Sequence, residues 1–249
     1  MNTFLCALST LTVFPVGKNF SPEKNQIRNS ANFYPLIGLG LGILLGICGF
    51  ALCKLLPLTL CAVILTFLSE VPTRAFHLDG LSDTFDGFFS SRPREKMLEI
   101  MHDSRCGVMG ILAIFMWGLC KFGAFLTLLQ NGSAFFTGCA IFFMTLYGRC
   151  ALVYHLSMTP YARKEGLGKL VFEGRPYFGI AASVIFSGLI WYLRCSFFWN
   201  ILPAVLLVFC YCWSRFTIRK IGGGTGDTLG ACEEITEVLT LFCFAYLPL

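Results

Sequence analysis

Charged side chains are scarce in this chain of 249 residues: they make up 13% of it, whereas hydrophobic residues make up 56%. A soluble domain of this length would not need several apolar runs of nearly twenty residues separated by short polar connectors. The scarcity of charge therefore excludes an ordinary soluble domain. It predicts an all-α, polytopic integral membrane bundle, a single domain over residues 1–249 with about six to eight transmembrane helices and cytoplasmic active-site loops.

Other features are absent as well. The apolar N-terminal piece Met1–Val16 has no basic region and no small-residue cleavage site, so we expect no cleavable signal peptide. None of the 13 cysteines has the paired C-x-x-C spacing of a metal site, which argues against bound transition metals and disulfides. No internal repeat of helices is visible, and this disfavours a transporter.

Apolar stretches predict seven membrane helices. They are Phe33–Leu56, Leu58–Phe76, Val108–Gln130, Ala134–Leu156, Tyr177–Leu193, Phe198–Trp213 and Ile235–Leu249. The segment Thr3–Val16 is too short to span comfortably, so we expect it to lie at the interface or to re-enter. Glycines at 38, 42 and 46 share one stripe of the first long helix and predict close helix packing.

The basic residues are distributed unevenly among the connectors. Four connectors hold most of them: Gly17–Asn32, His77–Gly107, Ser157–Pro176 and Ser214–Glu234. The alternate connectors hold only Lys54 and Arg194, so the positive-inside rule places the four rich loops in the cytoplasm. The orientation of the chain in the membrane, together with anion binding, then accounts for the net charge of +5. No nucleic-acid partner is expected. Because most carboxylates lie in the same loops, we expect an enzyme that works at the cytoplasmic membrane surface.

The stretch "HLDGLSDTFDG" concentrates carboxylates. Asp79, Asp83 and Asp86 are spaced i, i+4, i+7, so they form one stripe of a helix. Three such carboxylates repel one another unless a cation sits among them. Hard oxygen ligands without a cysteine or histidine cluster indicate Mg²⁺, with Mn²⁺ as the alternative. His77, two residues earlier, is a candidate general base or substrate hydrogen-bond partner, or else a structural residue.

A second segment, "PREKMLEIMHDSR", predicts a helix from Pro93 to about Arg105. Glu99 and Asp103 are spaced i, i+4, which favours a further cation site, although an amphipathic interfacial helix would show the same pattern. Arg92, Ser104 and Arg105 are candidate phosphate ligands, or positive-inside anchors in the case of the arginines.

Two glycine-containing loops follow. "IGGGTGDTLGA" would let backbone amides approach a phosphate, although it lacks the GK[ST] ending of a P-loop and also suits a flexible turn. Its candidate substrate-binding residues are Gly223, Gly224, Thr225, Gly226 and Asp227. The loop "YARKEGLGKLVFEG" contributes Arg163 and is either a lid or a linker.

Four motifs, "HLDGLSDTFDG", "REKMLEIMHDSRCGVMG", "YARKEGLG" and "GGGTGDTLGA", resemble in order and spacing the cobalamin synthase family, the adenosylcobinamide-GDP ribazoletransferases. The pieces "TVFPVG" and "FYPLIGLGLG" extend the resemblance over almost the whole chain. One departure is Arg74 and Ala75, where the family often has paired glycines, and another is Cys106 in place of an aliphatic residue.

The resemblance implies the last assembly step of the cobalamin nucleotide loop, which takes place at the cell inner membrane. In this step adenosylcobinamide-GDP reacts with α-ribazole, or with its 5′-phosphate, and GMP is released. The reaction depends on Mg²⁺. The resemblance implies catalytic roles for Asp83, Asp86, Asp103 and His77. It implies a metal held by Asp79, Asp83, Asp86, Asp103 and Glu99. Besides the substrates and the lipid bilayer, further copies of the chain and other corrinoid-assembly enzymes stay open as partners.

Two other functions are alternatives. The CDP-alcohol phosphotransferases of lipid synthesis carry paired aspartates, and this chain has a similar set of carboxylates: Asp83, Asp86, Glu99 and Asp103. The alanine-arginine pair of that family is missing here. A permease would use Lys121 and Arg149 as coupled intramembrane charges. In the enzyme interpretation, substituting those two residues would chiefly disturb folding or local packing.

Overall fold

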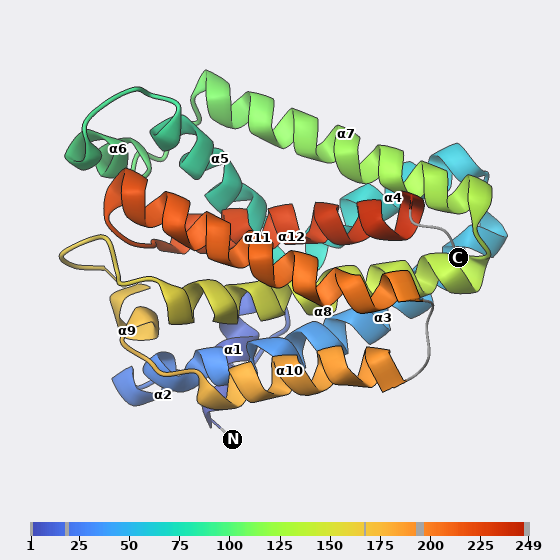
Figure 1. Ribbon diagram of the computed structural model, residues 1–249, viewed down its shortest axis with the longest axis horizontal. Helices are drawn as coiled ribbons and strands as arrows, with labels where there is room; N and C mark the ends of the chain where they lie inside the picture. Colours follow the sequence, from blue (N-terminus) through green and yellow to red (C-terminus); the bar gives the residue numbers. More distant parts are fainter. Residues whose placement is uncertain (1, 18–19, 167, 193–196, 247–249) are drawn as a thin grey trace.

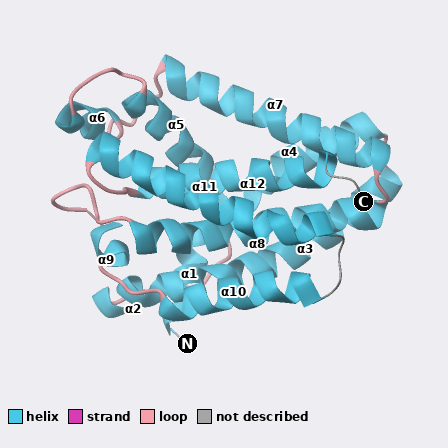
Figure 2. Ribbon diagram, in the orientation of Figure 1, coloured by secondary structure: helices cyan, strands magenta, loops and turns pink. Residues whose placement is uncertain are grey.

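The computed structural model describes residues 2–17, 20–166, 168–192 and 197–246 (Figure 1). Within that part, every regular element is a helix (Figure 2), as the composition predicts. Lys18, Arg194 and the ends of two expected spans, Leu193 and residues 247–249, lie outside the described residues. The cysteines that the structure describes are all free.

The α-helices follow one another along the whole chain. They are α1 Asn2–Leu11, α2 Lys24–Asn29, α3 Tyr34–Leu55, α4 Leu58–Glu70, α5 Phe76–Phe88, α6 Arg94–Ile100, α7 Val108–Asn131, α8 Ala134–Met158, α9 Gly168–Phe172, α10 Tyr177–Tyr192, α11 Phe197–Ile221 and α12 Gly226–Tyr246. Two 3₁₀ turns, Ser30–Phe33 and Val71–Thr73, precede α3 and follow α4.

Fewer helices qualify as membrane spans than the sequence predicts. In the described residues, four segments are long and apolar enough to cross a membrane, or five if α4 and α5 together count as one span. The four are Lys24–Leu55, Val108–Asn131, Ala134–Met158 and Leu202–Ile221. The expected count of seven is therefore too high by this criterion. The apolar part of α10 is too short, and α12 carries several carboxylates.

The expected span Leu58–Phe76 is broken. Helix α4 ends at Glu70, and the chain bends by 92° before α5 begins at Phe76. Arg74 and Ala75 make this bend with φ values of 58° and 53°, a region that glycine occupies without steric cost. The paired glycines expected at these two positions would suit the same bend.

Helix α8 is the central helix of the bundle, with 78% of its most apolar window buried. The glycine stripe of α3 packs against it, as predicted. A methyl group added at Gly42 would lie 2.7 Å from the Phe142 carbonyl oxygen, and one at Gly46 would lie 2.8 Å from that of Gly138. The two backbones therefore approach as closely as small residues allow.

Helix α12 begins at Gly226, nine residues before the expected start at Ile235, and α11 continues to Ile221 instead of ending near Trp213. The early start lets α12 cross α5 closely. A methyl group at Gly80 of α5 would lie 2.8 Å from the carbonyl oxygen of Asp227, and one at Gly230 would lie 2.8 Å from that of His77. This crossing fixes the acidic stripe of α5 against the first turn of α12.

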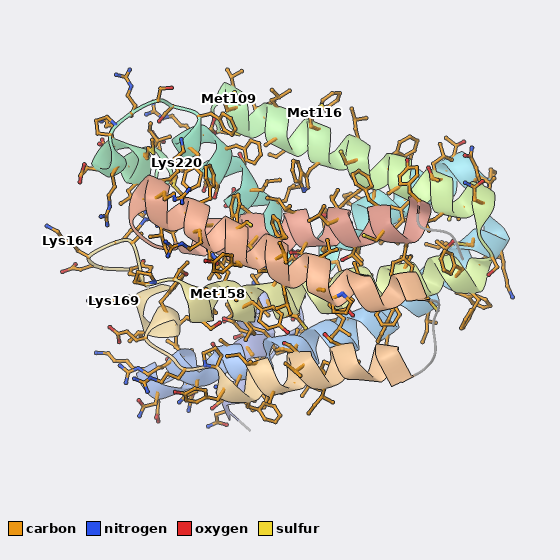
Figure 3. The ribbon with its side chains drawn as sticks, viewed as in Figure 1. Met109, Met116, Met158, Lys164, Lys169 and Lys220 are labelled. Atoms are coloured by element: carbon orange, nitrogen blue, oxygen red, sulfur yellow. The ribbon has the colours of Figure 1, made fainter. Side chains whose placement is uncertain are left out.

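The four basic connectors lie at one end of the bundle, on the left in Figure 1, together with α2, α6 and α9. Lys164, Lys169 and Lys220 mark this polar end in Figure 3. Between the two ends, α3, α4, α7 and α11 expose many large apolar side chains, for example Phe67 at 69% and Phe115 at 61%. An apolar belt with one polar end is the surface of a membrane protein whose chemistry lies at that end.

Candidate active site

The acidic stripe lies where the sequence predicts it, on α5. Asp79 is exposed in the first turn of the helix, and Asp83 and Asp86 are partly buried further along. The charged neighbours that act most strongly on Asp83 are Asp79, Asp227, Asp86 and Arg163. The structure thus brings together residues from α5, α12 and the loop after α8.

Asp86 has a defined structural task. Its Oδ2 accepts the backbone N–H of Gly107 at 2.7 Å, and its Oδ1 accepts that of Gly110 at 2.8 Å. These two N–H groups belong to the start of α7, where backbone donors have no partner within the helix and the helix dipole favours a carboxylate. Side chains at either glycine would collide with the Asp86 carboxylate. Asp86 therefore anchors α7 to α5.

Asp227 opens α12 and faces the same site. Its Oδ2 accepts a hydrogen bond from Arg163 Nη2 at 2.7 Å and one from Thr225 Oγ1 at 3.2 Å. Burial raises the pKa of Asp227, and the guanidinium of Arg163 opposes that rise. The pair is about one-fifth exposed, so it is shielded from bulk water but reachable.

The two glycine-containing loops, considered separately in the sequence, pair with each other. Ala162 N–H donates to the Gly224 carbonyl oxygen at 2.9 Å, and Gly224 N–H donates to that of Pro160 at 2.8 Å. Sequence reasoning missed Arg94 of α6, whose Nη2 donates to the Ala162 carbonyl oxygen at 3.1 Å. Its guanidinium also lies against Gly222, which has a φ of 78°. Arg94 thus joins α6 to both loops, and no local sequence signal distinguishes it from the basic residues around it.

The second acidic segment is organised differently from the prediction. Helix α6 ends at Ile100 instead of near Arg105, so Glu99 and Asp103 do not form an i, i+4 pair on one helix. Asp103 accepts the backbone N–H of Arg105 at 3.0 Å, a local turn bond that competes with helix continuation. The Arg105 side chain lies 2.6 Å from Asp103 and holds the pKa of this carboxyl at about 2.

The remaining candidates of this segment have local environments. Glu99 pairs with Lys96 at 2.7 Å on an exposed helix face. Arg92 and Ser104 are exposed. The described structure thus keeps these residues in the α5–α7 connector and gathers Asp79, Asp83 and Asp227 at the helix crossing.

His77 is 2% exposed, and neither of its ring nitrogens has a hydrogen-bond partner among the described residues. Its backbone is the point where Gly230 of α12 contacts α5. The side chain therefore faces away from the acidic stripe, as its two-residue offset from Asp79 indicates.

The donor set at the crossing fits a magnesium ion. Asp79 and Asp83 have no salt-bridge partner among the described residues, and Arg163 alone balances Asp227. Their oxygens are not gathered into a closed cage, since the described carboxylates that lie within 4.8 Å of one another are those of Glu70, Glu234 and Glu237. An open carboxylate set suits Mg²⁺, which commonly takes one or two carboxylates and completes its shell with water and substrate phosphate.

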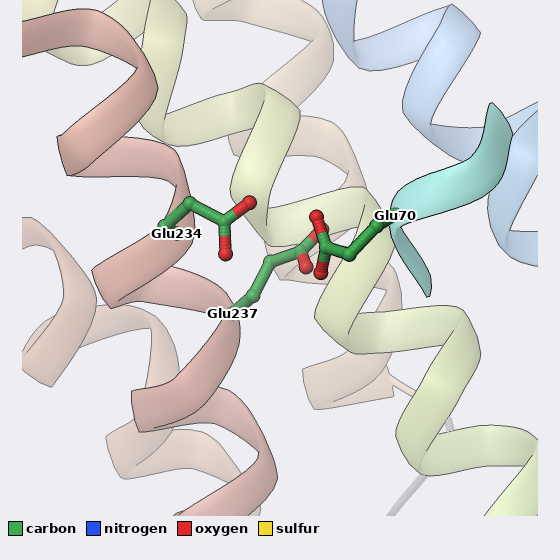
Figure 4. Close-up of side chains that lie close together, drawn as sticks. All are labelled: Glu70, Glu234 and Glu237. Atoms are coloured by element: carbon green, nitrogen blue, oxygen red, sulfur yellow. The ribbon is translucent and has the colours of Figure 1, made fainter. Parts of the chain in front are cut away.

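A second acidic cluster lies deep in the bundle (Figure 4), and the sequence analysis missed its carboxylates on α12. We call it the deep network; it consists of Lys121, Arg149, Glu70, Glu233, Glu234 and Glu237. Lys121 Nζ lies 2.6 Å from Glu70, 2.8 Å from Glu234 and 2.9 Å from Glu237. Arg149 pairs with Glu237 and, at 2.5 Å, with Glu233.

A sequence signal for this network did exist. The carboxylates of "GACEEITEVLTLF" interrupt an apolar segment, and two apolar helices each carry one cation without a local partner. Each carboxylate of the network contacts a cation of the protein itself. Lys121 and Arg149, the coupled charges of the permease alternative, are held in ion pairs inside the bundle.

The fold and the site define a class: a helical membrane protein with a cluster of carboxylates and one arginine at the polar end of its bundle. Residues 3–245 match the family described as cobalamin-5-phosphate synthase, and the chain belongs to that family. No solved structure gives a significant match.

Curated relatives agree with this assignment. The adenosylcobinamide-GDP ribazoletransferase of Thermoanaerobacter sp. (strain X514) is 34% identical over 98% of this chain and 96% of its own length. The protein of the same name from Clostridium tetani is 33% identical over the same shares. That from Fusobacterium nucleatum subsp. nucleatum is 34% identical over 100% of this chain and 98% of its own.

Proposed function

We propose that this chain is an adenosylcobinamide-GDP ribazoletransferase, a transferase of cobalamin biosynthesis. It transfers the adenosylcobinamide phosphate group from adenosylcobinamide-GDP to ribazole, or to its 5′-phosphate, and releases GMP. The observation that carries the proposal is the meeting of Asp79, Asp83 and Asp227 with Arg163 at the α5–α12 crossing, in a chain that matches the family over nearly its whole length.

The reaction is a phosphoryl-centred substitution. A ribose hydroxyl oxygen of the acceptor forms a bond to the phosphorus that carries the cobinamide, and the bond from that phosphorus to the bridging oxygen breaks. GMP leaves with the bridging oxygen, and the hydroxyl proton passes to a carboxylate of the site or to water. Negative charge accumulates on the phosphate oxygens, so positive charge placed beside them lowers the barrier.

The residues divide this work. Arg163, held in place by Asp227 and about one-fifth exposed, binds a phosphate oxygen in our proposal. Asp79 and Asp83 hold Mg²⁺ in our proposal, and Asp227 adds negative charge to the same site. A bound Mg²⁺ would act as a Lewis acid on the phosphate oxygens. Asp86 acts indirectly, by fixing the start of α7 beside the stripe.

The same proposal places the protein in the cell inner membrane with the polar end in the cytoplasm. The positive-inside rule supports this orientation, because the four basic connectors share that end. Both substrates then reach the site from the cytoplasm.

The test is a product assay on purified, lipid-reconstituted protein. Adenosylcobinamide-GDP and α-ribazole should give GMP and a cobalamin in the presence of Mg²⁺, and chelation should stop the reaction. Failure of folded protein to release GMP would contradict the proposal. Release of CMP from a CDP-alcohol would instead support the lipid-synthesis alternative.

A further inference from the structure

A cavity of about 330 Å³ lies at the polar end, enclosed by α1, α3, α8, α9 and the first turns of α5 and α12. Its volume falls at the lower end of the range for small-molecule sites, about 300–1,000 Å³. The lining is mostly apolar and aromatic, and includes Tyr34, Phe76, His77, Leu152, Val171 and Leu229. Such a lining suits an uncharged, hydrophobic group and disfavours a phosphate.

The unusual feature of the cavity wall is His77. It is 98% buried by side chains, given its 2% exposure, and both ring nitrogens are without hydrogen-bond partners in the described structure. Buried polar atoms in proteins nearly always have a partner, and leaving one unsatisfied costs about 1–3 kcal/mol. Because burial disfavours the charged form, the imidazole is neutral and offers one donor and one acceptor.

The position of the cavity ties it to the reaction. Gly226 and Leu229 line it and belong to the same turn of α12 as Asp227. His77 lies two residues before Asp79 on α5. The cavity therefore adjoins the α5–α12 crossing on the face of α5 that carries His77, and the acidic stripe lies on another face of the same helix.

We infer that this cavity binds the uncharged aromatic base of the ribazole acceptor, with His77 as the unpartnered polar side chain of its wall. Ribazole is a benzimidazole riboside, whose base is planar and apolar and has one unsubstituted ring nitrogen that accepts a hydrogen bond. The donor does not suit this cavity, because its diphosphate needs charge partners and its corrin ring is far too large. The inference rests on the proposed function and names the site of one substrate.

The first test fills the cavity. Val171 lies on the short helix α9 and packs against the core residues that line the cavity, so Val171→Trp should obstruct the cavity, and circular dichroism checks that the fold is kept. Val184→Trp is the matched control, because Val184 is 59% exposed on α10 and does not line the cavity. We expect Val171→Trp to raise the KM for α-ribazole about tenfold or more while the KM for adenosylcobinamide-GDP changes less than about twofold.

The second test concerns His77. His77→Ala should raise the KM for α-ribazole about tenfold, and His77→Gln, which keeps a donor and an acceptor, should recover part of the loss. An unchanged KM for α-ribazole in both Val171→Trp and His77→Ala would overturn the inference, and so would a rise confined to adenosylcobinamide-GDP. In either case, normal turnover by the wild type would leave the proposed function standing.

A binding measurement decides the matter even if no turnover is observed. The probe is 5,6-dimethylbenzimidazole, the free base of ribazole. Isothermal titration calorimetry of the reconstituted wild-type protein with this probe, without donor substrate or Mg²⁺, should show one binding site. Val171→Trp should lose that site and Val184→Trp should keep it. Equal binding by all three proteins, or none by the wild type, would contradict the assignment of the cavity.

Discussion

The molecule contains two acidic clusters that differ in what neutralises them. In the deep network, each of the four glutamates contacts Lys121 or Arg149. At the α5–α12 crossing, Asp227 alone has such a partner, Arg163, whereas Asp79 and Asp83 have none among the described residues. In the first cluster every carboxylate contacts a cation of the protein, with two cations for four carboxylates, whereas in the second Asp79 and Asp83 contact none that the structure describes.

The comparison shows that proximity of carboxylates does not by itself define a metal site. Glu70, Glu234 and Glu237 have oxygens within 4.8 Å of one another, closer than the aspartates of α5 (Figure 4). Yet Lys121 Nζ contacts all three and occupies the role that a cation would play. We propose that the more open aspartate set, and not the glutamates, holds the metal and the phosphates.

The largest effect on activity is expected from Asp83→Asn. The change removes one charge from the crossing but keeps the shape of the side chain, so we expect GMP release to fall about 100-fold or more. Circular dichroism and the thermal midpoint should stay at their wild-type values. An active Asp83→Asn enzyme would contradict the contrast between the two clusters, because catalysis at the crossing would then not depend on its unpaired carboxylates.

The largest effect on stability is expected from Lys121→Met. It leaves buried carboxylates without their cation, which typically costs about 3–5 kcal/mol. Denaturation of the detergent-solubilised protein measures the loss. Lys54→Met is the control, because Lys54 lies in the last turn of α3, over the Phe50 ring at 4.2 Å, and has no ion pair among the described residues. Partial recovery in the double variant with Glu234→Gln would show that the unpaired charge causes the loss.

A smaller effect is expected where Asp86 anchors α7. Gly110→Ala would push a methyl group against Ser82 and the Asp86 carboxylate, so we expect about 1–3 kcal/mol of destabilisation and reduced GMP release. Gly118→Ala, on the same helix, has open space around its added methyl group. It should leave activity unchanged and stabilise the helix by up to about 1 kcal/mol. Equal behaviour of the two variants would contradict the anchoring role.

The smallest effect is expected at an exposed pair. Arg28 and Glu173 lie 3.0 Å apart, with side chains 44% and 42% exposed. Glu173→Gln should change the free energy of unfolding by less than about 1 kcal/mol. Denaturation under the conditions used for Lys121→Met makes the two values comparable. A loss as large as that of Lys121→Met would mean that burial does not explain the stability of the deep network.

Local patterns were predictable from the sequence. The acidic stripe of α5 and the glycine stripe of α3 each involve residues within a few turns of one helix. The spacing of these residues along the sequence was therefore sufficient to predict that they share one face of the helix. The start of α12 was not predictable in this way, because Glu233 and Glu234 suggest a polar loop until their partners are known. Those partners are distant in sequence: Glu234, for instance, pairs with Lys121 of α7.

The candidate site shows the same division. Asp79 and Asp83 were identified from spacing, whereas the pairing of the two loops and the capping role of Asp86 depend on tertiary contacts. Asp103 was misplaced on a helix because its bond to the Arg105 amide ends α6 early. Helix ends decided by a single side-chain bond are hard to read from periodicity.

The most direct test of the comparison is to ask which cluster binds a divalent ion. Mn²⁺, a spectroscopic substitute for Mg²⁺, can be counted by electron paramagnetic resonance on the reconstituted protein with adenosylcobinamide-GDP present. The account predicts that Asp83→Asn loses the bound ion and that Glu234→Gln keeps it. Loss in Glu234→Gln with retention in Asp83→Asn would place the metal in the deep network and contradict the account.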